Sequence, residues 1–216
     1  MIDFHVHTLF SDGSLIPSEL VARAKDLSYI AFAITDHADG SNVEEVLKKT
    51  VRFVETMDPD CGLTVVAGVE LTHIHPKGIA GLTREARNLG ARVVVCHGET
   101  ITEPVCAGTN RAAIEAGVDV LAHPGLVGEA EARLAAERGV LFEITTRKGH
   151  SLTNGHVAAM AKRFGVELIL NTDTHSPEDL VTADYARRVA LGAGLGEDDY
   201  EKIKDNARRL LRKVSG

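Results

Sequence analysis

Histidine and acidic residues recur in short groups along this chain, and the first group stands at its start. The stretch MIDFHVHTLFSDGS places His5 and His7 two residues apart in an apolar run, and Asp12 follows them. Because side chains alternate along a strand, both imidazoles should point inward and leave Phe4 and Val6 for the covering helices. Burial of an imidazole costs free energy unless the ring is paired or ligated. The pair therefore indicates a bound partner in the interior.

Five further groups follow, each at the end of an apolar run. With the first group they give nine candidate metal ligands: His5, His7, Asp12, His37, Glu70, His97, His123, Asp173 and His175. Imidazole and carboxylate together suit Zn²⁺, Mn²⁺ or Fe²⁺, whereas the three cysteines form no CxxC pair that would indicate a thiolate site. One ion takes about four to six ligands, so nine candidates predict two or three divalent ions.

The elements that must position these residues are short β-branched runs that alternate with longer helical patterns. The runs predict strands at residues 2–6, 30–35, 63–70, 92–97, 118–122, 140–145 and 166–171. Such a pattern favours an α/β fold, either a closed barrel or an open doubly wound sheet, and no GxGxxG supports a dinucleotide site. Six of the seven runs deliver a candidate ligand at their carboxyl end. In a TIM-like barrel those ends meet at one mouth, so we expect the metal site there.

Helix boundaries follow from capping residues. Starts are indicated by a capping oxygen, a first-turn proline or a first-turn acid at Pro17 with Glu19, at Ser41 with Glu44 and at Ser176-Pro177-Glu178. Ends are indicated at Gly90, Gly117, Gly139 and Gly165, and a last helix is expected at residues 197–213. No linker or low-complexity segment interrupts the pattern, so residues 1–216 are predicted to form one domain.

Composition narrows the classes of partner. The net charge is −7, aromatic residues make up 4%, and lysine and arginine form no block, which disfavours nucleic acid and membrane surfaces. We expect neither a secretory leader nor a membrane span, because the first strand begins at Ile2 and no long apolar run occurs. The cysteines are expected to be reduced thiols, which predicts a cytoplasmic protein.

Several motifs carry a resemblance to a known family. HxHTxxSDG at residues 5–13, TDH at 35–37, GVE at 68–70, the single His97, HPG at 123–125 and DTH at 173–175 occur in the order typical of the PHP (polymerase and histidinol phosphatase) family. The resemblance implies a distorted (β/α)7 barrel with a trinuclear metal centre. It assigns three sets of ligands: His5, His7, Glu70 and Asp173; then Glu70, His97 and His123; then Asp12, His37 and His175. Several family members have histidine at the position of Asp12.

Clustered divalent cations lower the pKa of bound water and neutralise charge on phosphoryl oxygens. The expected activity is therefore that of a metal-dependent phosphoesterase acting on a small phosphomonoester, with a metal-activated hydroxide held by Glu70 and Asp173. The resemblance is strongest to small stand-alone histidinol-phosphatase-like proteins, which suggests histidinol phosphate or a similar metabolite. A nuclease or nucleotide phosphatase on the same centre is the alternative. A non-catalytic metal-binding module is a third, and an amidohydrolase-like enzyme is disfavoured because Glu70 stands where a bridging lysine is usual.

The run at 140–145 lacks a family ligand but is followed by a basic segment, EITTRKGHSLTNG at residues 143–155. A guanidinium can hold two phosphate oxygens at once, so Arg147 is predicted to contact the substrate phosphate. Lys148 in the same segment and Asn154 at the next helix start are further candidates for substrate binding.

The remaining polar residues near these motifs receive simpler interpretations. Asp3 and Asp36 lie beside candidate ligands and could orient imidazoles, although Asp3 could equally bond within the barrel floor. His73 and His75 after Glu70 are interpreted as surface-loop residues, with a place at the lip of the site or beside a ligand as the alternative, and His156 is interpreted as a helix-surface residue.

Overall fold

Parallel strands form one sheet that curves almost into a closed barrel. The computed structural model describes residues 1–58 and 60–215. Neighbouring strands follow the order β1 (Ile2–Val6), β2 (Ala31–Ile34), β4 (Thr64–Leu71), β5 (Val93–His97), β6 (Val120–Ala122), β7 (Leu141–Thr145) and β8 (Leu168–Asn171). The two edges meet where Val6 bridges to Thr174 and the His7 amide donates to the Thr174 carbonyl at 2.8 Å. The α/β barrel is therefore confirmed, and the open doubly wound sheet is excluded.

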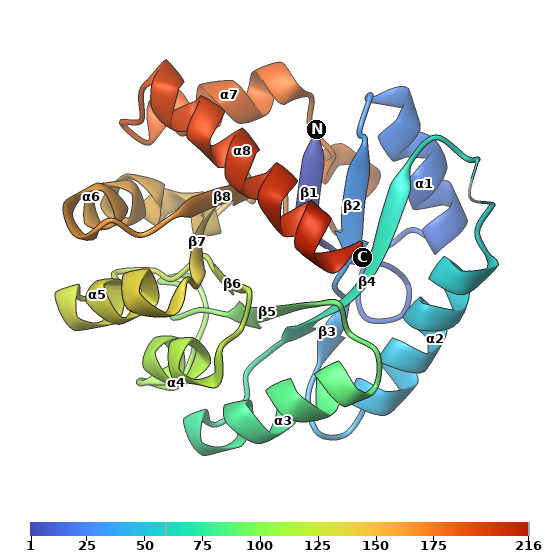
Figure 1. Ribbon diagram of the computed structural model, residues 1–216, viewed down its shortest axis with the longest axis horizontal. Coiled ribbons are helices and arrows are strands. Elements are labelled where there is room, and N and C mark those ends of the chain that lie inside the picture. The colour runs from blue at the N-terminus through green and yellow to red at the C-terminus, as the bar shows by residue number, and fades with distance from the viewer. Residues whose placement is uncertain (59, 216) are drawn as a thin grey trace.

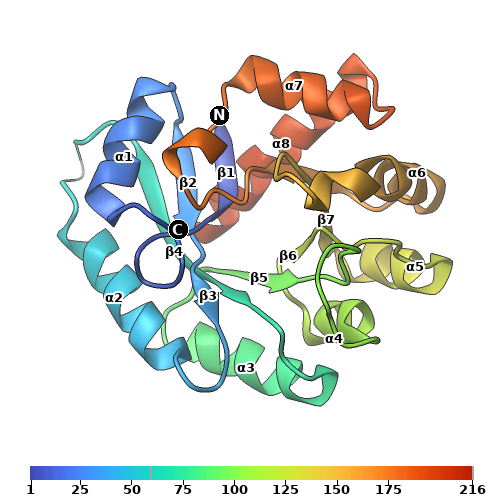
Figure 2. The same cartoon turned by 180° about the vertical axis from the view of Figure 1, so that it is seen from behind.

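Helices surround the strands and connect them, as Figures 1 and 2 show from opposite ends. They are α1 (Pro17–Asp26), α2 (Val43–Thr56), α3 (Pro76–Asn88), α4 (Thr109–Ala116), α5 (Glu129–Arg138), α6 (Asn154–Phe164), α7 (Ala183–Gly192) and α8 (Glu197–Val214). Two short 3₁₀ helices, η1 (His150–Thr153) and η2 (Pro177–Asp179), lie in the loops after β7 and β8. The four predicted glycine helix ends all have positive φ, between 69° and 100°.

Of the predicted helix starts, the one at Ser176-Pro177-Glu178 is confirmed, with Ser176 and Asp179 closing a capping box, but it begins only the three-residue η2, since Leu180 already has an extended backbone. The start predicted at Ser41 was wrong. Helix α2 begins at Val43, since the Ser41 hydroxyl donates to the Asp39 carboxylate instead of capping the helix.

The strand predicted at 30–35 is followed by a second short strand, β3 (His37–Ala38), which pairs only with β4. Residues 35 and 36 lie between the two strands, and their side chains form hydrogen bonds with neighbouring segments. The Thr35 hydroxyl accepts from the Val6 amide at 3.1 Å, and the Asp36 carboxylate turns toward the loop after β1. This break directs His37 toward the mouth of the barrel.

Apolar side chains fill the barrel interior at its amino-terminal end. Helix α8 lies across that end, in front of the strands in Figure 1 and behind them in Figure 2. Its Ala207, Leu210 and Val214 join the interior cluster, and the Asn206 side chain donates to the Leu168 carbonyl at 2.8 Å. Phe4 also belongs to this cluster, so its predicted position against the helices was wrong. The cause is an irregularity in the pairing of β1 with β2 between Asp3 and Val6.

Candidate metal centre

The mouth of the barrel brings all nine candidate ligands together. Strand β1 contributes His5, whose Nε2 lies 3.3 Å from Oε1 of Glu70 on β4 and 3.5 Å from Oδ1 of Asp173 after β8. His7 Nε2 lies 3.3 Å from the same Asp173 oxygen. All four side chains are buried. They are the residues that the family resemblance assigns to a first ion.

A second group shares Glu70. Its Oε1 lies 3.4 Å from Nδ1 of His97 at the end of β5 and 3.8 Å from Nε2 of His123 after β6. Nε2 of His123 is also 3.7 Å from Oδ2 of Asp173. The two carboxylates therefore stand between the groups, as bridging ligands would.

The third group is nearer to solvent. Oδ1 of Asp12 lies 3.4 Å from Nε2 of His175 and 3.6 Å from Nε2 of His37, and the two imidazole nitrogens are 3.3 Å apart. Asp12 is 57% exposed on the loop after β1, so this group forms the outer side of the centre.

Unpartnered atoms test whether this cluster fits a metal. Among the described residues, seven buried ring nitrogens and carboxylate oxygens in the cluster make no hydrogen bond; they belong to His5, His7, Glu70, His97 and His123. Buried polar atoms without partners are rare in proteins. Tetrahedral zinc with bonds of about 2.0–2.1 Å would place its ligands about 3.3–3.4 Å apart, close to the separations above. The side chains present therefore fit divalent cations.

Four groups of the cluster have the charge state that binds a cation. Burial disfavours the charged form of Glu70 and Asp173, but the surrounding imidazoles outweigh it and hold the pKa of both carboxyls well below the usual range. Burial lowers the pKa of His7 to about 3 and that of His123 well below its ordinary value. At neutral pH these four groups are in the forms that bind metal. Although burial opposes it, the same carboxylates, with Glu143 and Glu103, raise the pKa of His5, His37 and His97, so these three imidazoles would release a proton when an ion binds.

Two of the candidate ligands sit in unusual backbone. His123 has φ 28° and Asp173 has φ 55°, in the left-handed region that residues with a side chain rarely adopt. Gly125 follows in the same loop with φ 64°, and a Cβ there would stand 1.8 Å from the Glu99 carbonyl oxygen. Strain of this kind collects at functional sites because the surrounding contacts hold it in place.

The loop that carries Asp12 is fixed by Asp36. The Asp36 carboxylate accepts from the amides and hydroxyls of Thr8 and Ser11 at 2.6–3.0 Å. It contacts no imidazole by these bonds, so the idea that it orients one was wrong. Asp3 accepts from the His5 and Thr172 amides and from the Thr172 hydroxyl, which is the alternative of bonding within the barrel.

Two carboxylates that lie against imidazoles of the centre were missed in the sequence. Glu143 on β7 is fully buried, and its Oε2 lies 2.8 Å from Nδ1 of His5 while accepting from the Asn171 side chain at 2.9 Å. Glu103, in the loop after β5, lies 3.2 Å from Nε2 of His97. A charged residue inside the apolar run VLFEIT could have pointed to Glu143, but nothing in the local sequence distinguishes Glu103.

His150 was also missed as part of the centre. It is 7% exposed at the start of η1, and its ring stacks on that of His123 with centroids 4.1 Å apart. Its Nδ1 is held by the hydroxyls of Thr100 and Thr102, at 2.8 and 3.0 Å. Its Nε2 faces Glu103 at 3.4 Å.

A pocket of about 390 Å³ opens over the cluster, and Arg147 lines it. The Arg147 guanidinium donates to Oδ2 of Asp179 at 2.8 Å, and the same oxygen accepts from the His175 amide at 3.0 Å. Arg147 is thus fixed beside the third group of ligands, where sequence reasoning expected a phosphate contact.

The other two predicted substrate contacts lie elsewhere. Lys148 is exposed and lines a neighbouring hollow with Arg147 instead of the pocket over the ligands. Asn154 is buried, and its amide bonds to both backbone groups of Thr145, at 2.8 and 3.2 Å. Both of its polar ends are thereby occupied in joining β7 to α6, so the geometry does not support a substrate contact by Asn154.

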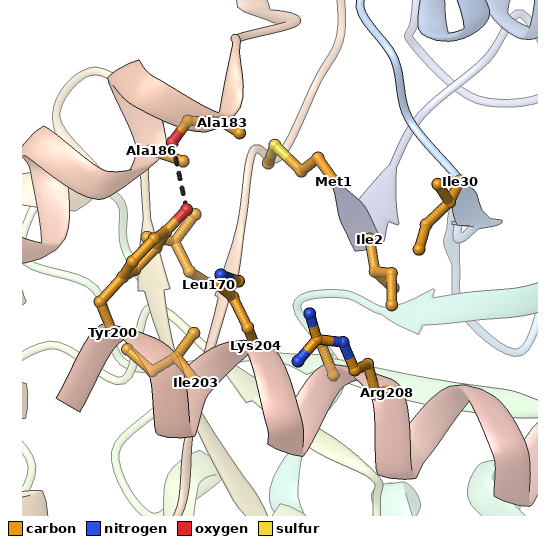
Figure 3. A pocket seen from close by; sticks show the side chains of 11 residues that line it. Met1, Ile2, Ile30, Leu170, Ala183, Ala186, Tyr200, Ile203, Lys204 and Arg208 are labelled. Atoms are coloured by element: carbon orange, nitrogen blue, oxygen red, sulfur yellow. Dashed lines mark hydrogen bonds between the residues drawn. The ribbon is translucent and has the colours of Figure 1, made fainter. Parts of the chain in front are cut away.

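A second pocket, of about 130 Å³, lies between α7, α8 and the start of β1 (Figure 3). Apolar side chains such as Met1, Ile2 and Ile203 line it, and the Tyr200 hydroxyl donates to the Ala183 carbonyl at 3.1 Å along one wall. None of the nine candidate ligands lines it. The groups suited to metal chemistry are therefore at the other end of the barrel.

One family model and several known proteins are similar to this chain. The family model described as "PHP domain" matches residues 3–214. An uncharacterized protein of Methanocaldococcus jannaschii is 47% identical and covers 98% of this chain and 99% of its own. Ribonuclease P protein component 3 of Methanosarcina barkeri is 28% identical over 91% of this chain and 82% of its own. A probable phosphatase of Shewanella sp. (strain ANA-3) is 28% identical over 94% and 85%.

Among solved structures, a chain of an archaeal ribonuclease P with mature tRNA superposes with a TM-score of 0.70. It is 21% identical and covers 97% of this chain and 89% of its own. That likeness concerns the fold. In the part of the chain that the structure describes, no helix is both long and apolar enough to span a membrane.

Proposed function

This chain belongs to the PHP domain family, and from that premise we propose that it is a metal-dependent phosphoesterase that hydrolyses a small phosphomonoester. One observation carries the proposal. A guanidinium, Arg147, is held by Asp179 in the lining of a pocket that five candidate metal ligands also line: Asp12, His37, His97, Asp173 and His175. Cations and a guanidinium on two sides of one pocket suit the oxygens of a phosphoryl group.

The three ligand sets that the resemblance assigns would hold the ions. Divalent ions in such a cluster supply positive charge for the phosphoryl oxygens and a hydroxide source near neutral pH. Glu70 and Asp173 are anionic and buried between the first two sets, so they would hold two ions at a fixed separation.

The protein's own groups would bind and orient the substrate. Arg147 would grip phosphoryl oxygens, and Asp179 keeps that side chain in place by bonding to it and to the His175 backbone. Because the guanidinium is held before the substrate arrives, little side-chain entropy is lost on binding.

The pocket suits a small polar substrate. Its volume is about 390 Å³, and its lining includes Asp12, Thr72, Asn42 and Glu103 alongside imidazoles. Histidinol phosphate or a similar small phosphorylated metabolite is the substrate that we propose.

A nuclease or nucleotide phosphatase is the second candidate. The similarity to a ribonuclease P protein component over most of this chain favours it. Binding of single strands commonly uses aromatic platforms on which bases stack. Among the described residues that line the pocket none is Phe or Tyr, so the phosphomonoester remains the leading proposal.

The experiment joins metal analysis of the purified protein to a phosphate-release screen. The panel contains histidinol phosphate, sugar phosphates, nucleoside mono- and bisphosphates and short oligonucleotides. His7→Ala should abolish turnover. Arg147→Ala should raise KM, with a loss of kcat/KM of about 10- to 150-fold for a lost charged hydrogen bond of about 1.5–3 kcal/mol. His156→Gln is the control, because His156 lies outside the cluster and bonds to the Val127 carbonyl.

Turnover of one monoester that depends on His7 would support the proposal, and turnover of oligonucleotides alone would favour the nuclease. Bound metal without turnover of any substrate would instead favour a non-catalytic metal-binding module. Full activity in His7→Ala would exclude the centre as the catalytic site.

A further inference from the structure

A fourth group of potential ligands stands at the lip of the mouth, outside the three sets above. It consists of His73 in the loop after β4, His97 at the end of β5 and Glu103 in the loop after β5. Oε2 of Glu103 lies 3.2 Å from Nε2 of His97 and 3.5 Å from Nε2 of His73. All three ligand atoms lie within 4.8 Å of one another. We call this group the lip cluster.

The chemistry of the lip cluster suits zinc. Two imidazole nitrogens and one carboxylate oxygen, with a position left for water, form a donor set that proteins use for Zn²⁺. The distances of 3.2 and 3.5 Å bracket the separation of about 3.3–3.4 Å expected between tetrahedral zinc ligands. The other oxygen of Glu103 faces Nε2 of His150 at 3.4 Å, which limits how the carboxylate can turn.

Two features separate this group from a chance meeting of surface side chains. Nε2 of His97 is buried and makes no hydrogen bond among the described residues, although it lies 3.2 Å from Glu103. His73 has φ 53°, a backbone conformation that costs free energy in a residue with a side chain. That conformation brings its ring to 4.9 Å from the His97 ring, between centroids.

His97 lies between the lip cluster and the metal centre. Its Nδ1 faces Glu70 at 3.4 Å on the inner side, and its Nε2 faces Glu103 at 3.2 Å on the outer side. A neutral imidazole has one nitrogen lone pair and one N–H. It can therefore ligate an ion on one side only, and the other nitrogen then carries the proton.

We propose that the lip cluster is a separate Zn²⁺ site that competes with the metal centre for His97. At low zinc His97 serves the inner ion beside Glu70 and His123, and its outer nitrogen carries the proton beside Glu103. At high zinc an ion bound by His73, His97 and Glu103 takes the Nε2 lone pair, the proton moves to Nδ1, and the inner ion loses one ligand.

Anomalous diffraction at the zinc edge tests the site directly, with crystals of the full chain grown at stoichiometric and at excess Zn²⁺. The test variant is His73→Asn, because asparagine tolerates positive φ and removes the imidazole. The matched control is His75→Asn on the same loop; His75 accepts a hydrogen bond from the Lys77 amide, a capping role that asparagine keeps.

At excess zinc we expect a peak bonded to His73 and Glu103 in the wild type and in His75→Asn, and none at that position in His73→Asn. Its appearance should coincide with reduced occupancy beside Glu70 and His123. Peaks confined to the metal centre in all three proteins would overturn the proposal and leave Glu103 as a group that only orients His97. Full occupancy at excess zinc of both the lip cluster and the position beside Glu70 and His123 would show that the two sites do not compete for His97.

Turnover supplies a second measurement, which rests on the proposed function whereas the diffraction does not. Excess Zn²⁺ should inhibit the wild type and His75→Asn, each normalised to its own rate at stoichiometric zinc. The half-inhibitory zinc concentration should rise at least about tenfold in His73→Asn, since loss of a ligand weakens binding by that much or more. Equal inhibition of all three proteins would count against the lip cluster as its cause.

Discussion

At the scale of single residues, the hydrogen bond between Glu143 and His5 should control the first ligand set. The two groups are fully buried, and Glu143 stabilises His5 in the orientation that aims Nε2 at Glu70 and Asp173. Carboxylates that bond to a ligating imidazole typically account for 10–100-fold in metal affinity. Glu143→Gln should therefore raise the Kd of the most tightly bound ion by about 10- to 100-fold. Competition with a chromophoric chelator measures this Kd.

The control for this change is Glu167→Gln, because Glu167 is exposed on the outside of the barrel and pairs with Arg209. Its metal affinity should equal that of the wild type. An unchanged metal affinity in Glu143→Gln would mean that backbone and packing alone set the position of His5.

Residue types and spacing were enough to predict the nine candidate ligands, because eight of them stand at or just after a strand end, where a parallel barrel gathers its side chains, and Asp12 follows on the first loop. The residues that hydrogen-bond to the histidines of the site were not predictable in the same way. His5 and Glu143 are 138 residues apart, and Thr100 and His150 are 50 apart. Such pairs depend on which strands and loops become neighbours, and a local pattern does not carry that information.

At the scale of elements, helix α8 should stabilise the barrel without taking part in the chemistry. Leu210 is buried against the interior cluster at the amino-terminal end of the strands, opposite the mouth. Leu210→Ala removes apolar contacts and leaves a cavity, which typically costs about 2–5 kcal/mol. We expect a lower free energy of unfolding in urea by about that amount, with kcat/KM unchanged at temperatures where the variant is folded.

The exposed neighbour Arg212 provides the comparison on the same helix. Arg212→Ala should change the free energy of unfolding by less than about 0.5 kcal/mol, the usual range for surface substitutions. A loss of activity in folded Leu210→Ala would show that α8 transmits strain to the mouth, contrary to this division of roles.

Seven strands and the last helix were predicted from periodicity, since burial on both faces and capping residues act locally. Two other features depend on contacts between distant segments. Thr35 and Asp36, between β2 and β3, bond to β1 and the loop after it, and Asp179 of η2 holds Arg147 from the loop after β7. These bonds help to place His37 and Arg147 at the mouth of the barrel.

At the scale of the whole molecule, bound ions should contribute to stability as well as to chemistry. The barrel closes at its mouth through β1 and the segment after β8, and both edges of that closure carry ligands: His5 and His7 on one side, Asp173 and His175 on the other. An ion held across this junction binds only the folded chain with high affinity, so it stabilises the fold by mass action. At a free concentration 100 times its Kd, the gain is about 2.7 kcal/mol.

Removal of the ions with a chelator should therefore lower Tm by about 5–10 °C, given about 2–4 °C per kcal/mol for a chain of this length. The measurement is a thermal melt followed by circular dichroism, with the ions then restored. His7→Ala should show little further decrease on chelation, because it has already lost a ligand at the junction, whereas His156→Gln should keep the full decrease. If the wild type melts at the same temperature with and without the chelator, its barrel is closed by backbone and core contacts alone, and the ions serve only the chemistry at the mouth.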